Sequence, residues 1–279
     1  MKTSLELPFP RLSEGRFASI YAYTDEELFS SFGIRIAFSE RMGGISEGPY
    51  RSLNVGRRVP DDQEKVAKNH SSLLEALGAG CEVCLTPYQV HRTDVYTVKL
   101  GQTDYASIQE EIEQGIDALI IEPPQVAALL CFADCVPIII VSPSSTFAVV
   151  HAGWKGMLGG IVQKAFRLLM HSDQTKGSSF SPKDYNIYIG PYIHSECFET
   201  GEDVCLAFVE AFGSSCMRDA SHVDLGQALR LSLEREGVDH MRIADVNVCT
   251  VCNNDRFYSY RAQGGVCGRH GAFAVRTRI

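Results

Sequence analysis

The sequence predicts an α/β fold in which the strands form mixed sheets. Continuous apolar runs at 126–132, 136–141 and 147–150 are typical of strands that are buried on both faces. Segments with the apolar spacing of helices alternate with such runs along the chain. Several strands follow one another through short turns, which favours mixed pairing over purely parallel pairing.

The individual elements follow from the same patterns. Strands are expected at 17–24 and 33–38, within 83–98, and at 126–132, 136–141, 147–150, 185–189 and 243–248, the last being the final clear strand. Helices are expected from Asp61 to Gly78 and at 161–170, 202–212 and 224–236. A loop rich in Gly, Ser and Pro covers 39–56. No interdomain linker is visible, so residues 1–279 are expected to form one domain.

Composition and charge restrict the partners. The chain has 26 Lys and Arg residues against 34 Asp and Glu, a net charge of -8, which argues against nucleic acid or an anionic membrane as a partner. The start of the chain carries Glu6 and Pro8 where a secretory signal needs an apolar stretch. The apolar runs are too short to span a bilayer. We therefore expect a soluble cytoplasmic protein whose ten cysteines stay reduced.

One thiol and two imidazoles lie where predicted strands end. His91 interrupts the segment 83–98, Cys135 lies between two apolar runs, and His151 follows a third run directly. A thiolate with two neutral imidazoles suits zinc or copper, and three protein ligands leave a fourth position open. This pattern indicates a catalytic metal site.

Three aspartates could support that site. Asp94, Asp117 and Asp134 lie close to the three candidate ligands in the sequence or between them. Each could accept a hydrogen bond from a ligand imidazole, and each could instead be a turn residue. Their spacing does not decide between these roles.

Other combinations of the same residue types remain open. Cys135 and His151 could act without a metal as the nucleophile and base of a cysteine hydrolase or amidase that cleaves cell-wall or peptide amides. The pairs Cys81/Cys84 and Cys249/Cys252 could together form a four-cysteine zinc site, although their separation is much longer than in a zinc ribbon, and buried reduced thiols are the alternative.

A further pattern has the residue types of the zinc nucleobase deaminases. His194 and Glu196 are followed by Cys249 and Cys252, but Val248 stands where that pattern has proline. We expect this likeness to be accidental.

Three arginines could bind an anion. Arg41, Arg261 and Arg269 lie in polar, glycine-containing segments, where a guanidinium could hold phosphate in a bidentate way or remain a solvated loop cation.

With these residues assembled, the chain resembles the laccase-domain family, whose members were first described as polyphenol oxidoreductases and are now associated with purine nucleoside phosphorylase activity. The resemblance extends along almost the whole chain. It is carried by Gly43-Gly44, 52–56, Gln89-Val90-His91, Ala133-Asp134-Cys135, His151-Ala152-Gly153-Trp154, 189–191, 197–199, Cys249-Thr250, 258–261 and Gly268-Arg269.

The resemblance implies a layered α/β sandwich with mixed β-sheets, similar to the catalytic domain of deamidating bacterial toxins. It implies one zinc held by His91, Cys135 and His151, which are then also the catalytic residues. The substrates would be purine nucleosides and phosphate. Adenosine, inosine, guanosine and 5′-methylthioadenosine would give the base and ribose 1-phosphate, with adenosine deaminase as a side activity.

A copper-dependent polyphenol oxidase is the alternative that the older description implies. Eight widely scattered histidines fall short of the ligands that a multicopper oxidase requires. For the phosphorylase, we expect Arg41 and the glycine-rich turns to position phosphate and ribose. Asn54 and Asp134 are expected to hydrogen-bond the nucleoside or a metal ligand.

Two departures from the family pattern concern the substrate more than the fold. Lys155 follows Trp154 where arginine is frequent, so a bidentate anion contact would become a point charge there. The segment 262–267 also differs from the more charged sequence expected after Arg261.

Overall fold

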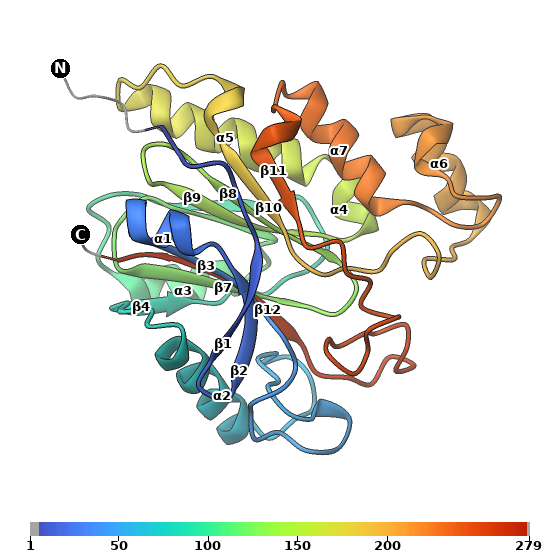
Figure 1. The fold of residues 1–279 in the computed structure, drawn as a ribbon, viewed down its shortest axis with the longest axis horizontal. Helices are drawn as coiled ribbons and strands as arrows, with labels where there is room; N and C mark the ends of the chain where they lie inside the picture. Colours follow the sequence, from blue (N-terminus) through green and yellow to red (C-terminus); the bar gives the residue numbers. More distant parts are fainter. Residues whose placement is uncertain (1–5, 278–279) are drawn as a thin grey trace.

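Two six-stranded sheets form the centre of the protein, as a computed structural model that describes residues 6–277 shows (Figure 1). The first sheet has the order β1 (Ser13–Phe17), β2 (Ile20–Thr24), β3 (Ile34–Ser39), β12 (His270–Arg276), β7 (Val126–Phe132) and β4 (Val83–Leu85). The second has the order β11 (Ile243–Asp245), β10 (Asn186–Ile189), β8 (Val136–Val141), β9 (Phe147–Ala152), β6 (Ala118–Ile121) and β5 (Val95–Val98). Both sheets are mixed, because the pairs β4/β7, β10/β11 and β5/β6 are parallel and the other neighbours are antiparallel.

The two sheets pack face to face, and helices cover their outer faces. Alternation along β9 shows the layers: Phe147 and Val149 face the core shared with β7, whereas Ala148 and Val150 face the helices. The second sheet is covered by α4 (Trp154–Leu158), α5 (Ile161–Thr175), α6 (Glu202–Phe212) and α7 (Leu225–Arg235), which lie together in Figure 1. Helix α2 (Gln63–Ala76) covers the first sheet.

The remaining short elements close the ends of the layers. Helices α1 (Glu26–Phe32) and α3 (Tyr105–Ile112) add buried Leu28, Phe32, Ile108 and Ile112 to the core between the sheets. Aspartates 25, 62, 104 and 224 cap the starts of α1, α2, α3 and α7 by accepting backbone N–H groups. Single turns of 3₁₀ helix lie at Gly48–Tyr50, Pro182–Asp184, Ser214–Cys216 and His240–Arg242.

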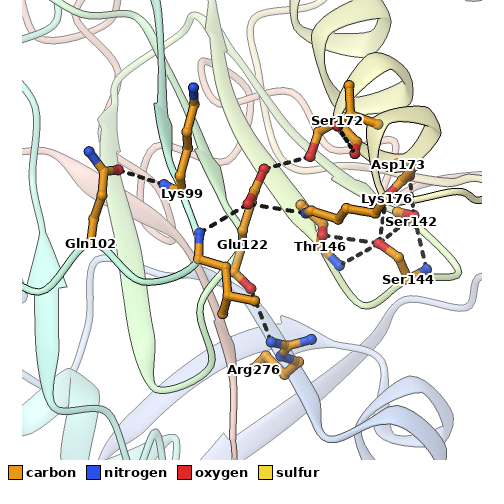
Figure 2. A network of polar contacts seen from close by, with 12 residues as sticks. Lys99, Gln102, Glu122, Ser142, Ser144, Thr146, Ser172, Asp173, Lys176 and Arg276 are labelled. Atoms are coloured by element: carbon orange, nitrogen blue, oxygen red, sulfur yellow. Dashed lines mark hydrogen bonds and ion pairs between the residues drawn. The ribbon is translucent and has the colours of Figure 1, made fainter.

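A buried polar network connects α5 to the β8–β9 turn and to the end of β6 (Figure 2). The carboxylate of Asp173 accepts hydrogen bonds of 2.6 Å from the hydroxyls of Ser142 and Ser144 in the β8–β9 turn. Glu122, at the end of β6, accepts from Ser172 at 2.6 Å, and its backbone oxygen accepts from Arg276 of the other sheet at 3.0 Å. The network therefore holds both sheets and α5 together at the end away from the site described below.

The expected α/β class with mixed sheets is confirmed, and most expected elements are present. Residues 17–24 are not one strand: they contain the last residue of β1, the turn of the β1–β2 hairpin and all of β2. The strand expected at 243–248 ends at Asp245. The expectation of no clear strand after 248 is wrong, because β12 lies in the middle of the first sheet between β3 and β7. Its residues His270-Gly271-Ala272 are small or polar, so that end carries little apolar signal.

Two expectations about the fold stay predictions: the likeness to deamidating toxins and the organisation as one domain. Among the described residues, no helix is long and apolar enough to cross a membrane.

Candidate active site

The register of the second sheet places Asp117 beside His151. Strand β6 pairs with β9 so that Ala118 is opposite Val150, and the residues just beyond are therefore Asp117 and His151. The backbone N–H of His151 donates to the oxygen of Asp117 at 2.8 Å, which extends the ladder by one step. On the other side of β9, Pro137 is opposite His151, and Cys135 immediately precedes β8. Strand β9 thus brings a carboxylate, an imidazole and a thiol to one edge.

The third candidate ligand comes from the loop between β4 and β5. His91 adopts a left-handed conformation with φ of 62°. Its loop is fixed by Gln89, whose amide donates to the oxygen of Cys131 and accepts from its N–H, each at 2.8 Å. The structure therefore brings His91, Cys135 and His151 together, with one potential ligand atom of each lying within 4.8 Å of the others.

The carboxylate of Asp117 organises both imidazoles. It is fully buried, and it accepts from Nδ1 of His151 at 2.8 Å and from the backbone N–H of His91 at 2.9 Å. The N–H of Arg92 donates to the other oxygen at 2.7 Å. Because Nδ1 of His151 is engaged in this way, Nε2 is left for Cys135 or a metal. The spacing in the sequence did not decide which of Asp94, Asp117 and Asp134 accepts a hydrogen bond from a candidate ligand imidazole. In the structure, Asp117 does.

Charge is concentrated among these groups. Burial raises the pKa of Cys135, but the charge of His151 and hydrogen bonds from both imidazoles outweigh it and lower that pKa to about 6. Burial likewise opposes protonation of His151, but the Cys135 thiolate and Asp117 raise its pKa to about 9. The metal-free site therefore favours a thiolate beside an imidazolium.

Gly153 allows the close approach of the ligands. A Cβ atom at this position would lie 3.0 Å from Sγ of Cys135 and 3.1 Å from Cδ2 of His91, so any larger residue would push both side chains away. The ring of Phe132 packs edge-on against His151, with 5.4 Å between the ring centroids. The small residue Gly153 and the apolar ring of Phe132 therefore help to position the three candidate ligands, as the polar contacts do.

A cavity of about 550 Å³ opens beside the three residues. This volume lies in the range typical of small-molecule sites. Its walls combine the aromatic rings of Tyr88, Trp154, Phe198 and Tyr260 with the cations Arg57, Arg58, Arg261 and Arg269. Sequence reasoning singled out Arg261 and Arg269 as candidate ligands of phosphate. Phe198 and Tyr260 lie in segments that carry the family resemblance, but no role was expected for them, and Arg57, Arg58 and Tyr88 were missed altogether.

Asp134 lies in the cavity wall, but both of its carboxylate oxygens have partners. They accept from the hydroxyl of Thr250 at 2.6 Å and from the N–H of Arg261 at 2.7 Å. Asp134 has φ of 88°, and its backbone oxygen accepts from Ile193. It therefore joins the Cys135 turn to the loops that follow β10 and β11.

Arg41 and Asn54, expected to bind substrate, are not among the residues that line the cavity. The guanidinium of Arg41 donates to the backbone oxygens of Arg51 and Asn254 and lies over the ring of Tyr258. Asn54 is fully buried and bonds to Asp61, Gly56 and Arg269. Both side chains hold the loop 39–56 in place.

The alternative cysteine arrangements are corrected by the structure. Cys81 and Cys84 lie near β4 and pack against the core under α2, whereas Cys249 and Cys252 lie beside Cys197 and Glu196. The proposed four-cysteine set is therefore wrong. The segments of the deaminase-like pattern do meet, but Cys197 rather than the His194 ring belongs to the cluster.

Comparisons with known proteins identify the family of the chain. A family model described as multi-copper polyphenol oxidoreductase laccase matches residues 35–277. A purine nucleoside phosphorylase of Bacteroides thetaiotaomicron is 32% identical over 254 residues, which cover 88% of this chain and 92% of the relative. Purine nucleoside phosphorylase YlmD of Geobacillus stearothermophilus is 33% identical over 257 residues, covering 88% and 90%.

The solved structures lead to the same group. The crystal structure of YlmD from Geobacillus stearothermophilus matches with a TM-score of 0.80 and 28% identity, covering 96% of this chain and all of the other. That of the Bacillus licheniformis hypothetical protein YfiH matches with a TM-score of 0.79 and 25% identity, covering 93% and 98%. The fold and the family match thus define a laccase-like α/β protein. The chain belongs to the multi-copper polyphenol oxidoreductase laccase family, and the resemblance noted in the sequence is confirmed.

The charge distribution makes a prediction about thiol reactivity. With a pKa of about 6, Cys135 is mostly a thiolate at pH 7, whereas burial raises the pKa of Cys131 to about 12. In metal-free protein, iodoacetamide should modify Cys135 before Cys131, at a rate that falls as the pH drops through about 6. Peptide mass spectrometry after timed quenching measures both. A midpoint above pH 8, the range of an ordinary cysteine, would contradict this description.

Proposed function

We propose that this chain is a zinc-dependent purine nucleoside phosphorylase that converts a purine nucleoside and phosphate into the free base and ribose 1-phosphate. The observation that carries the proposal is the convergence of His91, Cys135 and His151 at a cavity lined by aromatic rings and arginines. The names of the relatives supply the reaction class. Adenosine, inosine, guanosine and 5′-methylthioadenosine are the proposed substrates, with deamination of adenosine to inosine as a side reaction.

The donor set suits a metal ion. Two imidazoles and a thiolate are the ligand types of catalytic zinc sites, and the hydrogen bond from Nδ1 of His151 to Asp117 is the usual support of a ligand histidine. Zinc in such a site supplies a Lewis acid next to the substrate. Copper accepts the same ligand types, but one set of three donors holds a single ion, and multicopper oxidation requires several. Zinc is therefore the proposed metal.

The walls of the cavity divide into two kinds of surface. The rings of Phe198 and Tyr260 offer flat apolar faces on which a purine base can stack, whereas the guanidinium of Arg58 covers one face of Tyr88. Arg57 and Arg58 are exposed at the opening, and the guanidinium of Arg57 donates no hydrogen bond to any residue between 6 and 277. A free guanidinium group suits the bidentate binding of phosphate. Arg58, by contrast, pairs with the carboxylate of Glu113 at 3.6 Å. We assign phosphate to Arg57, with Arg58 beside it, in place of Arg41.

The remaining residues orient the reactants and limit water. Asp117 keeps His151 and His91 in fixed positions, so that the reacting groups meet a preorganised site. Asp134 positions the loop bearing Arg261, and Trp154 lies in the wall beside the ligands. Phosphate attack on the ribose carbon requires alignment of two bound substrates, which is the contribution expected of these walls.

A second candidate follows from the contact between Asp117 and His151. Cys135, His151 and Asp117 together have the composition and order of contacts of a cysteine hydrolase triad. Such an enzyme would cleave peptide or cell-wall amides without metal. His91 has no part in a triad, and its position beside the thiol favours the metal-dependent reaction.

Product analysis tests the proposed reaction. Metal-quantified protein is incubated with each of the four nucleosides, with and without phosphate, and the base and ribose 1-phosphate are separated by chromatography. We expect phosphate-dependent release of base. This activity should be lost in His151→Ala and retained in His171→Ala, which changes an exposed histidine on α5.

In Arg57→Ala the KM for phosphate should rise roughly tenfold, because one charged hydrogen bond to phosphate is lost.

Two outcomes of the same experiment would contradict the proposal. Base released equally without phosphate would indicate hydrolysis of the nucleoside. Absence of base together with amide cleavage by the metal-free protein would instead support the triad.

The contacts of Asp117 predict how the metal is held. In Asp117→Asn the charge that favours the metal-bound His151 is lost, and zinc affinity should fall about 10-fold to 100-fold. Competition with a chromophoric chelator measures this. Asp94→Asn is the matched control, because Asp94 is exposed and supplies only its backbone oxygen to Asp117 and Ala118. Equal affinity in Asp117→Asn and the wild type would rule out the supporting role.

A further inference from the structure

A second group of potential ligands lies outside the three residues of the candidate site. Cys197 and Glu196 belong to the segment between β10 and α6, and Cys249 and Cys252 belong to the turn after β11. The two segments are aligned by a parallel bridge between Tyr192 and Cys249. Residues some fifty positions apart in the chain are thereby brought to one place.

The distances in this cluster suit a tetrahedral ion. Sγ of Cys197 is 3.5 Å from Sγ of Cys252, and Sγ of Cys252 is 4.0 Å from Oε1 of Glu196. One ligand atom of each of the four residues lies within 4.8 Å of the others. Zinc–sulfur bonds of about 2.3 Å in tetrahedral geometry separate neighbouring sulfurs by about 3.8 Å. The four donors therefore need only small movements to share one ion.

The surroundings also fit a group of thiolates. The backbone N–H of His194 points at Sγ of Cys249, 3.4 Å away, as an amide supporting a ligand sulfur does. Arg218 lies 3.8 Å from the carboxylate of Glu196, and Arg261 donates to the backbone oxygens of Cys197 and Glu199. These cations offset the negative charge that three thiolates and a carboxylate would leave around a divalent ion.

We infer that Cys197, Cys249, Cys252 and Glu196 bind a second divalent ion of the zinc type, separate from the ion of the candidate active site. Four protein ligands fill its coordination sphere, which is the arrangement of a structural site. The inference is independent of the proposed phosphorylase reaction. It also differs from a disulfide, which would join two sulfurs and leave the third thiol and Glu196 unexplained.

The position of this ion gives it a defined task. Thr250, within the cysteine turn, donates to Asp134, the neighbour of Cys135. Arg261 connects Asp134 to the backbone at Cys197 and lines the cavity. An ion that joins the two segments would therefore fix the wall of the cavity that carries Phe198 and Arg261. Its removal should loosen this wall without removing a ligand of the other ion.

Metal stoichiometry tests the inference. Zinc per chain is measured by mass spectrometry of anaerobically purified wild type, Cys252→Ser, Cys135→Ser and Cys81→Ser. Cys252→Ser should hold one equivalent less than the wild type, whether or not the His91, Cys135 and His151 site is filled. Cys81→Ser, which changes a half-buried cysteine near β4, should match the wild type.

Cobalt substitution provides a readout that does not depend on stability alone. Thiolate-to-cobalt charge transfer in Cys135→Ser should retain most of the wild-type absorbance, because the three thiolates of the second cluster remain. In Cys252→Ser the same band should weaken. An unchanged zinc content in Cys252→Ser would overturn the inference, as would recovery of Cys197 and Cys252 as a disulfide from the anaerobic wild-type protein.

Discussion

The buried carboxylate of Asp117 is the interaction on which the candidate site depends. It accepts from the ring of His151 and from the backbone of His91 and Arg92, so it sets the direction of one imidazole and the turn that presents the other. A fully buried carboxylate is costly unless its oxygens are satisfied, and here every partner belongs to the site. The same contacts hold the pKa of Asp117 below its ordinary range against the opposing effect of burial.

The register of the second sheet places the other candidate ligands next to the pair Asp117 and His151. Strand β9 lies between β6 and β8, so His151 has Asp117 on one side and the start of β8, with Cys135, on the other. The parallel neighbour β5 begins at Val95, which returns the His91 loop to the same edge, and the N–H of Asp117 donates to the oxygen of Asp94 at 3.0 Å. A shift of one residue in this register would turn His151 toward the helices on the other face.

The sequence predicts this site in part because strand ends are visible as the limits of apolar runs. His91, Cys135 and His151 stood out for that reason, and their convergence follows from the sheet. The choice of Asp117 over Asp94 depended on pairing between strands distant in sequence, which spacing does not encode. Arg41 and Asn54 have side chains of the kind that binds substrate, but their polar groups instead bond to backbone groups of segments without regular structure. Cys249 and Cys252 were recognised as a pair, but their partner Cys197 was not, because the bridge that joins them spans two separate loops.

Anomalous diffraction at the zinc edge, from crystals of protein that cleaves nucleosides, tests the central claim most directly. The account predicts a peak about 2.0–2.3 Å from a nitrogen of His91, Sγ of Cys135 and a nitrogen of His151. Nδ1 of His151 should still face Asp117, so the bound nitrogen should be Nε2. An active protein with no peak at these three atoms, or with His151 turned so that Asp117 faces no ring nitrogen, would contradict the account.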